Sequence, residues 1–235
     1  GNAYTGVGDP FLPFREVLAL LTGDVEAAWT ARAIPREQAR RLYHLLPLAV
    51  QALMQEGPEL IGTLLPGPTL LARARAYAPE GADWLAGLAG LIERRSSGPG
   101  NPSLQQSDLF EQYTRVLKAL AQQRPLLLFL DDLQWVDTSS AGLLFHLGRR
   151  IEGSRVLVVG AYRPSEVALQ PHPLPPIVGE FQRTFGETGI DLERAEGRRF
   201  VEDYLDTEPN RLGPSFRETF TRQPGGHPLF TVALL

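Results

Sequence analysis

The stretch Leu126-Leu-Leu-Phe-Leu-Asp131-Asp132-Leu-Gln-Trp135-Val-Asp137 decides the fold of this chain. Five apolar residues lead directly into two adjacent carboxylates. A short apolar run bounded by turn signals is typical of a strand that is buried on both faces, as in a parallel sheet. Acids at the carboxyl end of such a strand lie where open α/β sheets bind ligands. The stretch therefore predicts a buried strand over 126–130 that ends in a ligand site.

A second apolar run, Arg155-Val-Leu-Val-Val-Gly-Ala-Tyr162, predicts a second buried strand. Between the two, Asp137 followed by Thr-Ser-Ser is expected to cap a helix that runs to about Glu152. A strand, a helix and a strand within so few residues form a βαβ unit. The strands of such a unit are parallel neighbours.

The two acids have the pattern of a Walker B segment, in which one carboxylate holds Mg²⁺ and its neighbour orients water. Side chains alternate along a strand, so the two acids are expected to differ in role. Asp131 is the metal-ligand candidate, and Asp132 is the candidate for orienting water; both are candidate catalytic residues. The alternative is that one of them caps or salt-bridges the strand end. Trp135 is expected to be a core or domain-contact residue.

Arg163 follows the second predicted strand, beside the two acids by sheet geometry. An arginine in this place is able to bind the γ-phosphate of a nucleotide, as a sensor. The alternative is a solvated arginine at a strand end.

Most of the remaining chain has the periodicity of helices. Residues 11–95 are interpreted as a helical insertion that packs on a core, with an interaction surface for another domain as the alternative. Within this region, a first helix is expected to end at Gly23, and Asp24 is expected to cap a short second helix. A third helix is expected to start at Pro35 and to be broken or kinked at Pro47. Further helices are expected at 58–65, 69–78 and 82–95. Further on we expect a loop at 96–102, a long helix ended by Pro125, a helix near 176–186, a strand at 188–192 and a helical segment from Glu193 onward.

The composition of the chain argues against several classes of function. The 235 residues are 43% hydrophobic and 21% charged, and the net charge of −4 argues against a nucleic-acid surface. Cysteine is absent, no apolar run approaches the roughly 18 residues of a membrane span, and there is no signal-peptide pattern. The four histidines are scattered, so a histidine metal site is not expected. The sequence contains no G-x-S-x-G elbow, so a hydrolase triad is not expected.

The sequence contains no Walker A motif. This loop requires a lysine in G-x-x-x-x-G-K-[ST], and Lys118 is the only lysine of the chain. Lys118 lies in a helical segment without glycine. Gly6-Val-Gly8 precedes Asp-Pro instead of a helix start, so it is interpreted as a turn.

Three motifs resemble those of the signal-transduction ATPases with numerous domains, the STAND branch of AAA-like P-loop NTPases. Asp131 to Asp137 is similar to their Walker B segment, Gly160-Ala-Tyr-Arg163 to their sensor 1, and Gly226-His-Pro228 to the Gly-x-Pro turn of their lid. The resemblance implies an α/β fold: a P-loop NTPase-like parallel sheet flanked by helices, with a large helical insertion and the start of a helical lid. It further implies an ATPase core over 1–192 and a lid over 193–235. ATP or ADP with Mg²⁺ would be the cofactors, bound in part by Arg163, Gly226 and Pro228.

The chain departs from this family in two places. Walker A, which family order puts just upstream of Gly1, is missing, and Ala233 stands where members often carry a glutamate. A truncated ATPase module is therefore expected, one that alone neither binds ATP tightly nor hydrolyses it. The expected partners are the nucleotide and other domains of the same polypeptide, with a homo-oligomer as an open alternative. Nucleic acid and membrane are not expected partners, and the expected location is the bacterial cytoplasm. The rival hypothesis is a degenerate NTPase fold that serves only as a protein-interaction module.

Overall fold

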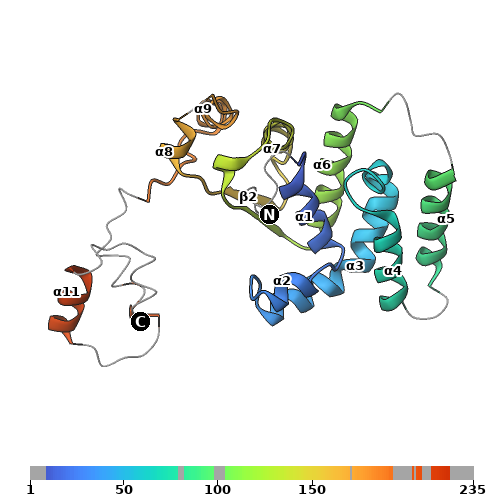
Figure 1. Ribbon diagram of the computed structural model, residues 1–235, viewed down its shortest axis with the longest axis horizontal. Coiled ribbons are helices and arrows are strands. Elements are labelled where there is room, and N and C mark those ends of the chain that lie inside the picture. The colour runs from blue at the N-terminus through green and yellow to red at the C-terminus, as the bar shows by residue number, and fades with distance from the viewer. Residues whose placement is uncertain are drawn as a thin grey trace. The chain divides into compact units, whose positions relative to one another are not determined.

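The computed structural model describes residues 9–78, 82–97, 104–169, 171–192, 203, 205–207 and 213–222. The chain divides into two compact units, residues 1–181 and 182–235, and each is described by itself. In the first unit, helix α6 lies between the helices α3, α4 and α5 on one side and α7 with the two strands on the other (Figure 1).

Three helices open the first unit: α1 (Leu12–Leu21), α2 (Glu26–Thr30) and α3 (Arg36–Glu56). The predicted end of the first helix is confirmed, because Gly23 has a φ of 80°, which glycine adopts without steric strain. The apolar residues of α1 and α3 face each other in the core, as the periodicity predicted.

Two details of this region differ from expectation. Asp24 does not cap α2; Val25 is the N-cap residue, and the Asp24 carboxylate instead pairs with Arg73 at 2.8 Å. Pro47 does not break α3, which is continuous through it. Proline removes one helical hydrogen bond. Buried Leu46 and Val50 flank the proline, so burial of the apolar face holds the helix together there.

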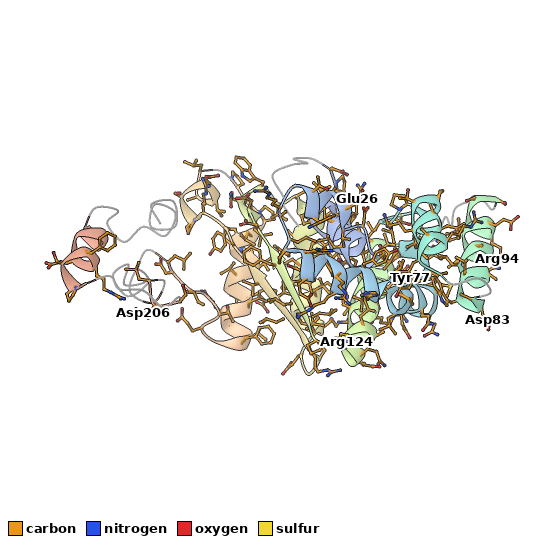
Figure 2. All side chains as sticks on the ribbon, turned by 90° about the horizontal axis from the view of Figure 1, so that it is seen from below. Glu26, Tyr77, Asp83, Arg94, Arg124 and Asp206 are labelled. Carbon is orange, nitrogen blue, oxygen red and sulfur yellow. The ribbon has the colours of Figure 1, made fainter. Side chains whose placement is uncertain are left out.

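The next segment is only partly helical. The predicted helix at 58–65 is wrong: a single 3₁₀ turn, η2 (Pro58–Leu60), is followed by a bridge between Ile61 and Leu65. Gly62, with a φ of 94°, turns the chain there. Helices α4 (Gly67–Tyr77) and α5 (Asp83–Ser97) follow and pack against each other (Figure 2). Ser96 and Ser97 of the predicted loop belong to α5, and the rest of that loop lies outside the described residues.

The long helix predicted before Pro125 is α6 (Gln106–Gln123), and it contacts both halves of the core. Tyr113 of α6 is completely buried, and its hydroxyl donates a hydrogen bond of 3.0 Å to the carbonyl oxygen of Phe14. The two rings meet edge to face with centroids 5.5 Å apart. This contact ties α1 to α6.

The predicted βαβ unit is confirmed. Strands β1 (Leu126–Leu130) and β2 (Val156–Gly160) pair in parallel, with Leu126 opposite Val156 and Leu130 opposite Gly160. The expectation that both faces are buried is wrong. Leu128 and Leu130 are buried against the helices, whereas Leu127 and Leu157 on the opposite face are 68% and 61% exposed. The exposed side chains alternate with the buried ones because successive residues of a strand point to opposite faces.

Helix α7 (Thr138–Arg150) connects the strands, and α8 (Pro164–Val167) and α9 (Leu174–Phe185) follow β2. The predicted helix near 176–186 is thus confirmed. The Phe181 ring of α9 stacks on Phe145 of α7 with centroids 6.1 Å apart. A Cβ at Gly148 would lie 2.2 Å from the Phe181 ring, so any other residue at this position would displace the ring from its place against α7.

In the second unit the structure describes α11 (Pro214–Arg222) and an ion pair of 2.6 Å between Asp206 and Arg217. The strand predicted at 188–192 is absent. The structure pairs those residues with no other strand within its described part, and an unpaired strand is not stable. Most of the predicted lid lies outside the described residues. Among the described helices, none is both long and apolar enough to cross a membrane.

Candidate functional site

The carboxyl ends of β1 and β2 meet at one edge of the sheet. The Ala161 amide donates to the carbonyl oxygen of Leu130, and the Leu133 amide donates to that of Ala161, both at 2.9 Å. The two hydrogen bonds continue the pairing beyond the strands. Asp131 follows β1 and Arg163 follows β2, so both residues lie at the same edge of the sheet.

Asp131 is exposed, and its Oδ1 accepts a hydrogen bond of 2.9 Å from the backbone amide of Asp132. Asp132 has a φ of 55°, in the left-handed region, which aspartate tolerates better than most residues. Its Oδ1 accepts a hydrogen bond of 2.9 Å from Nε2 of Gln134. The chain thus turns sharply after β1, and the two carboxylates have different partners.

Neither of the two acids is buried with the strand. Asp131 is exposed and Asp132 is half-buried, because both lie beyond Leu130, the last residue of β1. Each carboxylate also accepts one hydrogen bond within the chain. The pair is therefore held without a large desolvation penalty.

Gln134 links the parts of this edge. It is buried, and its Oε1 accepts a hydrogen bond of 3.2 Å from the backbone amide of Arg163 while its Nε2 binds Asp132. Its backbone oxygen lies 3.0 Å from Nε2 of His172. One amide side chain therefore joins the segment after β1 to the segment after β2.

The guanidinium of Arg163 is 70% exposed and pairs with Glu166 at 2.9 Å. Sheet geometry brings the Arg163 backbone beside the acids, as expected. Among the described contacts, its side chain makes none with Asp131 or Asp132. The structure places Arg163 at the site but leaves its role as a sensor a prediction.

Asp137 caps α7, as predicted. Its Oδ1 accepts hydrogen bonds from the amides of Ser139 at 2.8 Å and Ser140 at 2.9 Å, and the Ser140 hydroxyl donates to its Oδ2. The carboxylate also lies at the positive end of the helix dipole. The cap fixes the segment between the acids and α7. Trp135 is 37% exposed, so its predicted place in the core is wrong, and contact with another domain stays a prediction.

The strand-end acids fit a Mg²⁺ ion in part. Magnesium is usually held by one or two carboxylates together with waters and phosphate oxygens, and an exposed carboxylate such as Asp131 meets the first requirement. The described residues contain no cluster of three or more side chains that would hold a metal by themselves. A bound phosphate would have to complete the coordination. Gly226 and Pro228, which the resemblance assigns to nucleotide binding, lie outside the described part of the chain.

Two residues of this edge were not predicted from the sequence: Gln134 and His172. Gln134 is a polar residue in an otherwise apolar stretch after the acids, and this isolated position was the available signal. His172 lies between two prolines, and no feature of the sequence associates it with a position 38 residues earlier. Their role depends on how the two strand ends meet.

One comparison with known proteins identifies a family for this chain. A family model described as an AAA ATPase domain matches residues 14–159. No curated protein matches the chain, and no solved structure matches it either. The matched region covers more than half of the sequence and includes β1, both acids and nearly all of β2. The chain therefore belongs to the AAA ATPase domain family.

Proposed function

We propose that the chain is part of the ATP-binding switch of a STAND-type bacterial regulator, carrying Walker B, sensor 1 and the start of the lid. The observation that carries the proposal is the meeting of Asp131, Asp132 and Arg163 at the carboxyl edge of two parallel strands. Proteins of the AAA ATPase family generally use ATP or ADP with Mg²⁺. This edge is where such a ligand binds in an open α/β sheet.

The contacts of the two acids suggest separate roles. The exposed Asp131 carboxylate is suited to a Mg²⁺ ion that bridges the phosphates. The Asp132 carboxylate is oriented by Gln134, so it is suited to holding a water molecule in a fixed direction. Oriented carboxylates of this kind position the nucleophile in phosphoryl transfer.

Arg163 is able to exchange its partner. An exposed ion pair such as Arg163–Glu166 contributes only about 0–1 kcal/mol, because both charges remain solvated. A phosphate oxygen offers stronger, charge-assisted hydrogen bonds. We propose that the guanidinium leaves Glu166 for the γ-phosphate, and that Pro228 in the lid lies against the adenine.

The proposal requires a phosphate loop from residues outside this sequence, because no G-x-x-x-x-G-K-[ST] occurs among the 235 residues. The exposed apolar face of the sheet, with Leu127 and Leu157, is compatible with further chain packing there. The complete site would bind nucleotide, and the lid would pass the difference between ATP and ADP to other domains of the polypeptide.

Calorimetry with Mg-ATP tests this proposal at two levels. The 235-residue chain is expected to show no binding in the micromolar range, since the phosphate-binding amides and lysine are missing. The reading frame upstream is then sequenced. If it encodes a phosphate loop within about 60 residues, the extended protein should bind Mg-ATP, as P-loop proteins do. Asp131→Asn should remove the Mg²⁺ dependence of that binding, whereas Glu152→Gln, at the far end of α7, should leave it unchanged.

Micromolar binding by the 235-residue chain would overturn the proposal of an incomplete site. A Met start upstream with no phosphate loop would favour the second candidate, a non-enzymatic interaction module. One observation favours that candidate: both acids already have partners within the chain, as structural residues do. The extended protein distinguishes the ATPase switch from the interaction module. The interaction module would show no Mg²⁺-dependent nucleotide binding, so Asp131→Asn would change nothing.

A further inference from the structure

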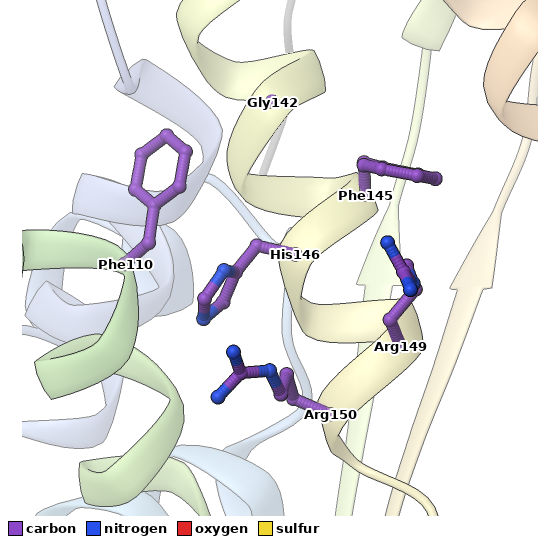
Figure 3. Close-up of a pocket in the computed structure, with 6 residues that line it drawn as sticks. All are labelled: Phe110, Gly142, Phe145, His146, Arg149 and Arg150. Carbon is purple, nitrogen blue, oxygen red and sulfur yellow. The ribbon is translucent and has the colours of Figure 1, made fainter. Parts of the chain in front are cut away.

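A cavity of about 340 Å³ lies between α6 and α7, away from the edge that carries Asp131. Figure 3 shows its lining: Phe110 comes from α6, and the other residues from successive turns of α7. This volume is at the lower end of the range for small-molecule sites. The lining residues are Phe110, Gly142, Phe145, His146, Arg149 and Arg150.

The cavity has an apolar part. Phe110 meets the His146 ring edge to face, with centroids 5.7 Å apart, and Phe145 lines the opposite side (Figure 3). Gly142 borders this part, and a Cβ there would reach van der Waals contact with the Phe110 ring at 3.4 Å. A larger side chain at position 142 would fill the space between the two helices.

The other part of the cavity is positively charged. The Arg149 guanidinium lies over the Phe145 ring, 5.6 Å from its centroid, and has no carboxylate partner among the described residues. Arg150 shares Glu111 with His146, at 2.8 and 3.4 Å. Two guanidinium groups thus face one carboxylate, and Lys118, whose Nζ donates to the Arg150 carbonyl at 3.2 Å, adds a further positive charge nearby.

His146 adds no further positive charge to the cavity. Its Nε2 is buried and makes no hydrogen bond of good geometry. Burial and the adjacent Arg150 charge lower the pKa of His146, against the opposing effect of Glu111, so the ring is neutral at pH 7. The positive charge of Arg149 has no carboxylate partner among the described residues, and it lies beside the apolar part of the cavity.

We propose that this cavity binds a small organic carboxylate, with its apolar body between Phe110 and Phe145 and its carboxylate on Arg149 and Arg150. A planar carboxylate matches the guanidinium fork and supplies the one negative charge that the cavity lacks. The site is separate from the nucleotide edge, because Asp137 caps the first turn of α7 and both arginines lie in its last turn. A ligand there would bridge α6 and α7 and stabilise their contact.

An NMR titration of the 235-residue chain tests the proposal with 3-phenylpropionate as the probe and the neutral 3-phenylpropionamide as its matched analogue. The carboxylate should shift the Gly142 amide signal in a saturable way, with a dissociation constant on the order of millimolar for so small a ligand. The amide should bind about 10-fold more weakly, because it lacks the charge-assisted hydrogen bonds.

Arg149→Gln should weaken carboxylate binding by about 10-fold or more, since it removes the uncompensated guanidinium. Arg40→Gln, an exposed arginine on α3 with the same change of charge, is the control and should leave binding unchanged. Gly142→Leu, which fills the apolar part, should abolish binding by both probes.

Three results would each overturn the proposal: no saturable shift with the carboxylate, equal affinities for the carboxylate and the amide, or equal weakening by Arg149→Gln and Arg40→Gln. The arginines also have a structural explanation, since cations at the C-terminus of a helix stabilise its dipole. In that case Arg149→Gln lowers the melting temperature without changing the binding of the probe.

Discussion

Replacing Asp137 by alanine tests whether the cap of α7 holds the segment that carries the two acids. The substitution removes the acceptor of two backbone amides, those of Ser139 and Ser140, and of the Ser140 hydroxyl. Loss of an N-cap side chain costs about 1 kcal/mol. Loss of the carboxylate from the positive end of the dipole costs roughly 0.3–1 kcal/mol.

The Ser140 hydroxyl adds to this sum. Ser140 is completely buried, so without Asp137 its hydroxyl loses a partner that water does not readily replace. That loss is worth about 1 kcal/mol. The free energy of unfolding should therefore fall by about 2–3 kcal/mol, and the melting temperature by about 4–12 °C for a chain of this size.

Urea unfolding followed by circular dichroism measures the change, and two variants separate its causes. Asp137→Asn keeps a side-chain acceptor for the amides and loses only the charge, so it should be destabilised by less than half as much. In Asp137→Ala with Ser140→Ala, the orphaned hydroxyl is gone, and the loss should be smaller than the sum of the single changes. A loss below about 0.5 kcal/mol for Asp137→Ala, or an equal loss for Asp137→Asn, would refute the reasoning.

Two further predictions concern the first unit. Tyr113→Phe should lower the unfolding free energy by about 1 kcal/mol, because it removes the buried hydrogen bond from the Tyr113 hydroxyl to the Phe14 carbonyl. The exposed Tyr43→Phe is the control and should stay within about 0.5 kcal/mol in the same urea experiment. The second follows from His146, whose pKa is lowered in the folded state by burial and by Arg150: the unfolded chain takes up the proton first, so stability should fall as the pH drops below about 6.5. Melting temperatures between pH 8 and 5 should fall less steeply in His146→Gln than in the unmodified protein, and equal slopes would contradict the buried neutral imidazole.

Local patterns were sufficient to predict the elements of the site. The apolar run before Asp131 predicted β1, the second run predicted β2, and their spacing predicted parallel pairing. The cap at Asp137 could also be predicted, since it depends only on a short polar side chain and the amides that follow it. The cap and each strand depend on residues close in sequence, and the parallel pairing follows from the length of the helical connection, so the sequence contains the information for all three.

Burial could not be predicted in the same way. Apolar runs predicted strands buried on both faces, but Leu127 and Leu157 are exposed because the described helices cover only the opposite face. Pro47 was expected to break or kink its helix, but α3 continues through it, with buried residues on both sides of the proline. Residues 188–192 have strand-like composition but no described partner strand. In each case, the burial or pairing of the element depends on which segment, distant in sequence, packs against it.

The sequence alone determined that two carboxylates follow a strand and that an arginine follows the next one. Only the tertiary structure decided how these ends are joined: the left-handed turn at Asp132 aims its carboxylate at Gln134, and Gln134 holds the backbone of Arg163. The physical reason is that a strand's direction and pairing are set by its own residues and its neighbour. The orientation of a side chain beyond the strand end depends on buried polar groups from both segments, and these meet only when the sheet has formed.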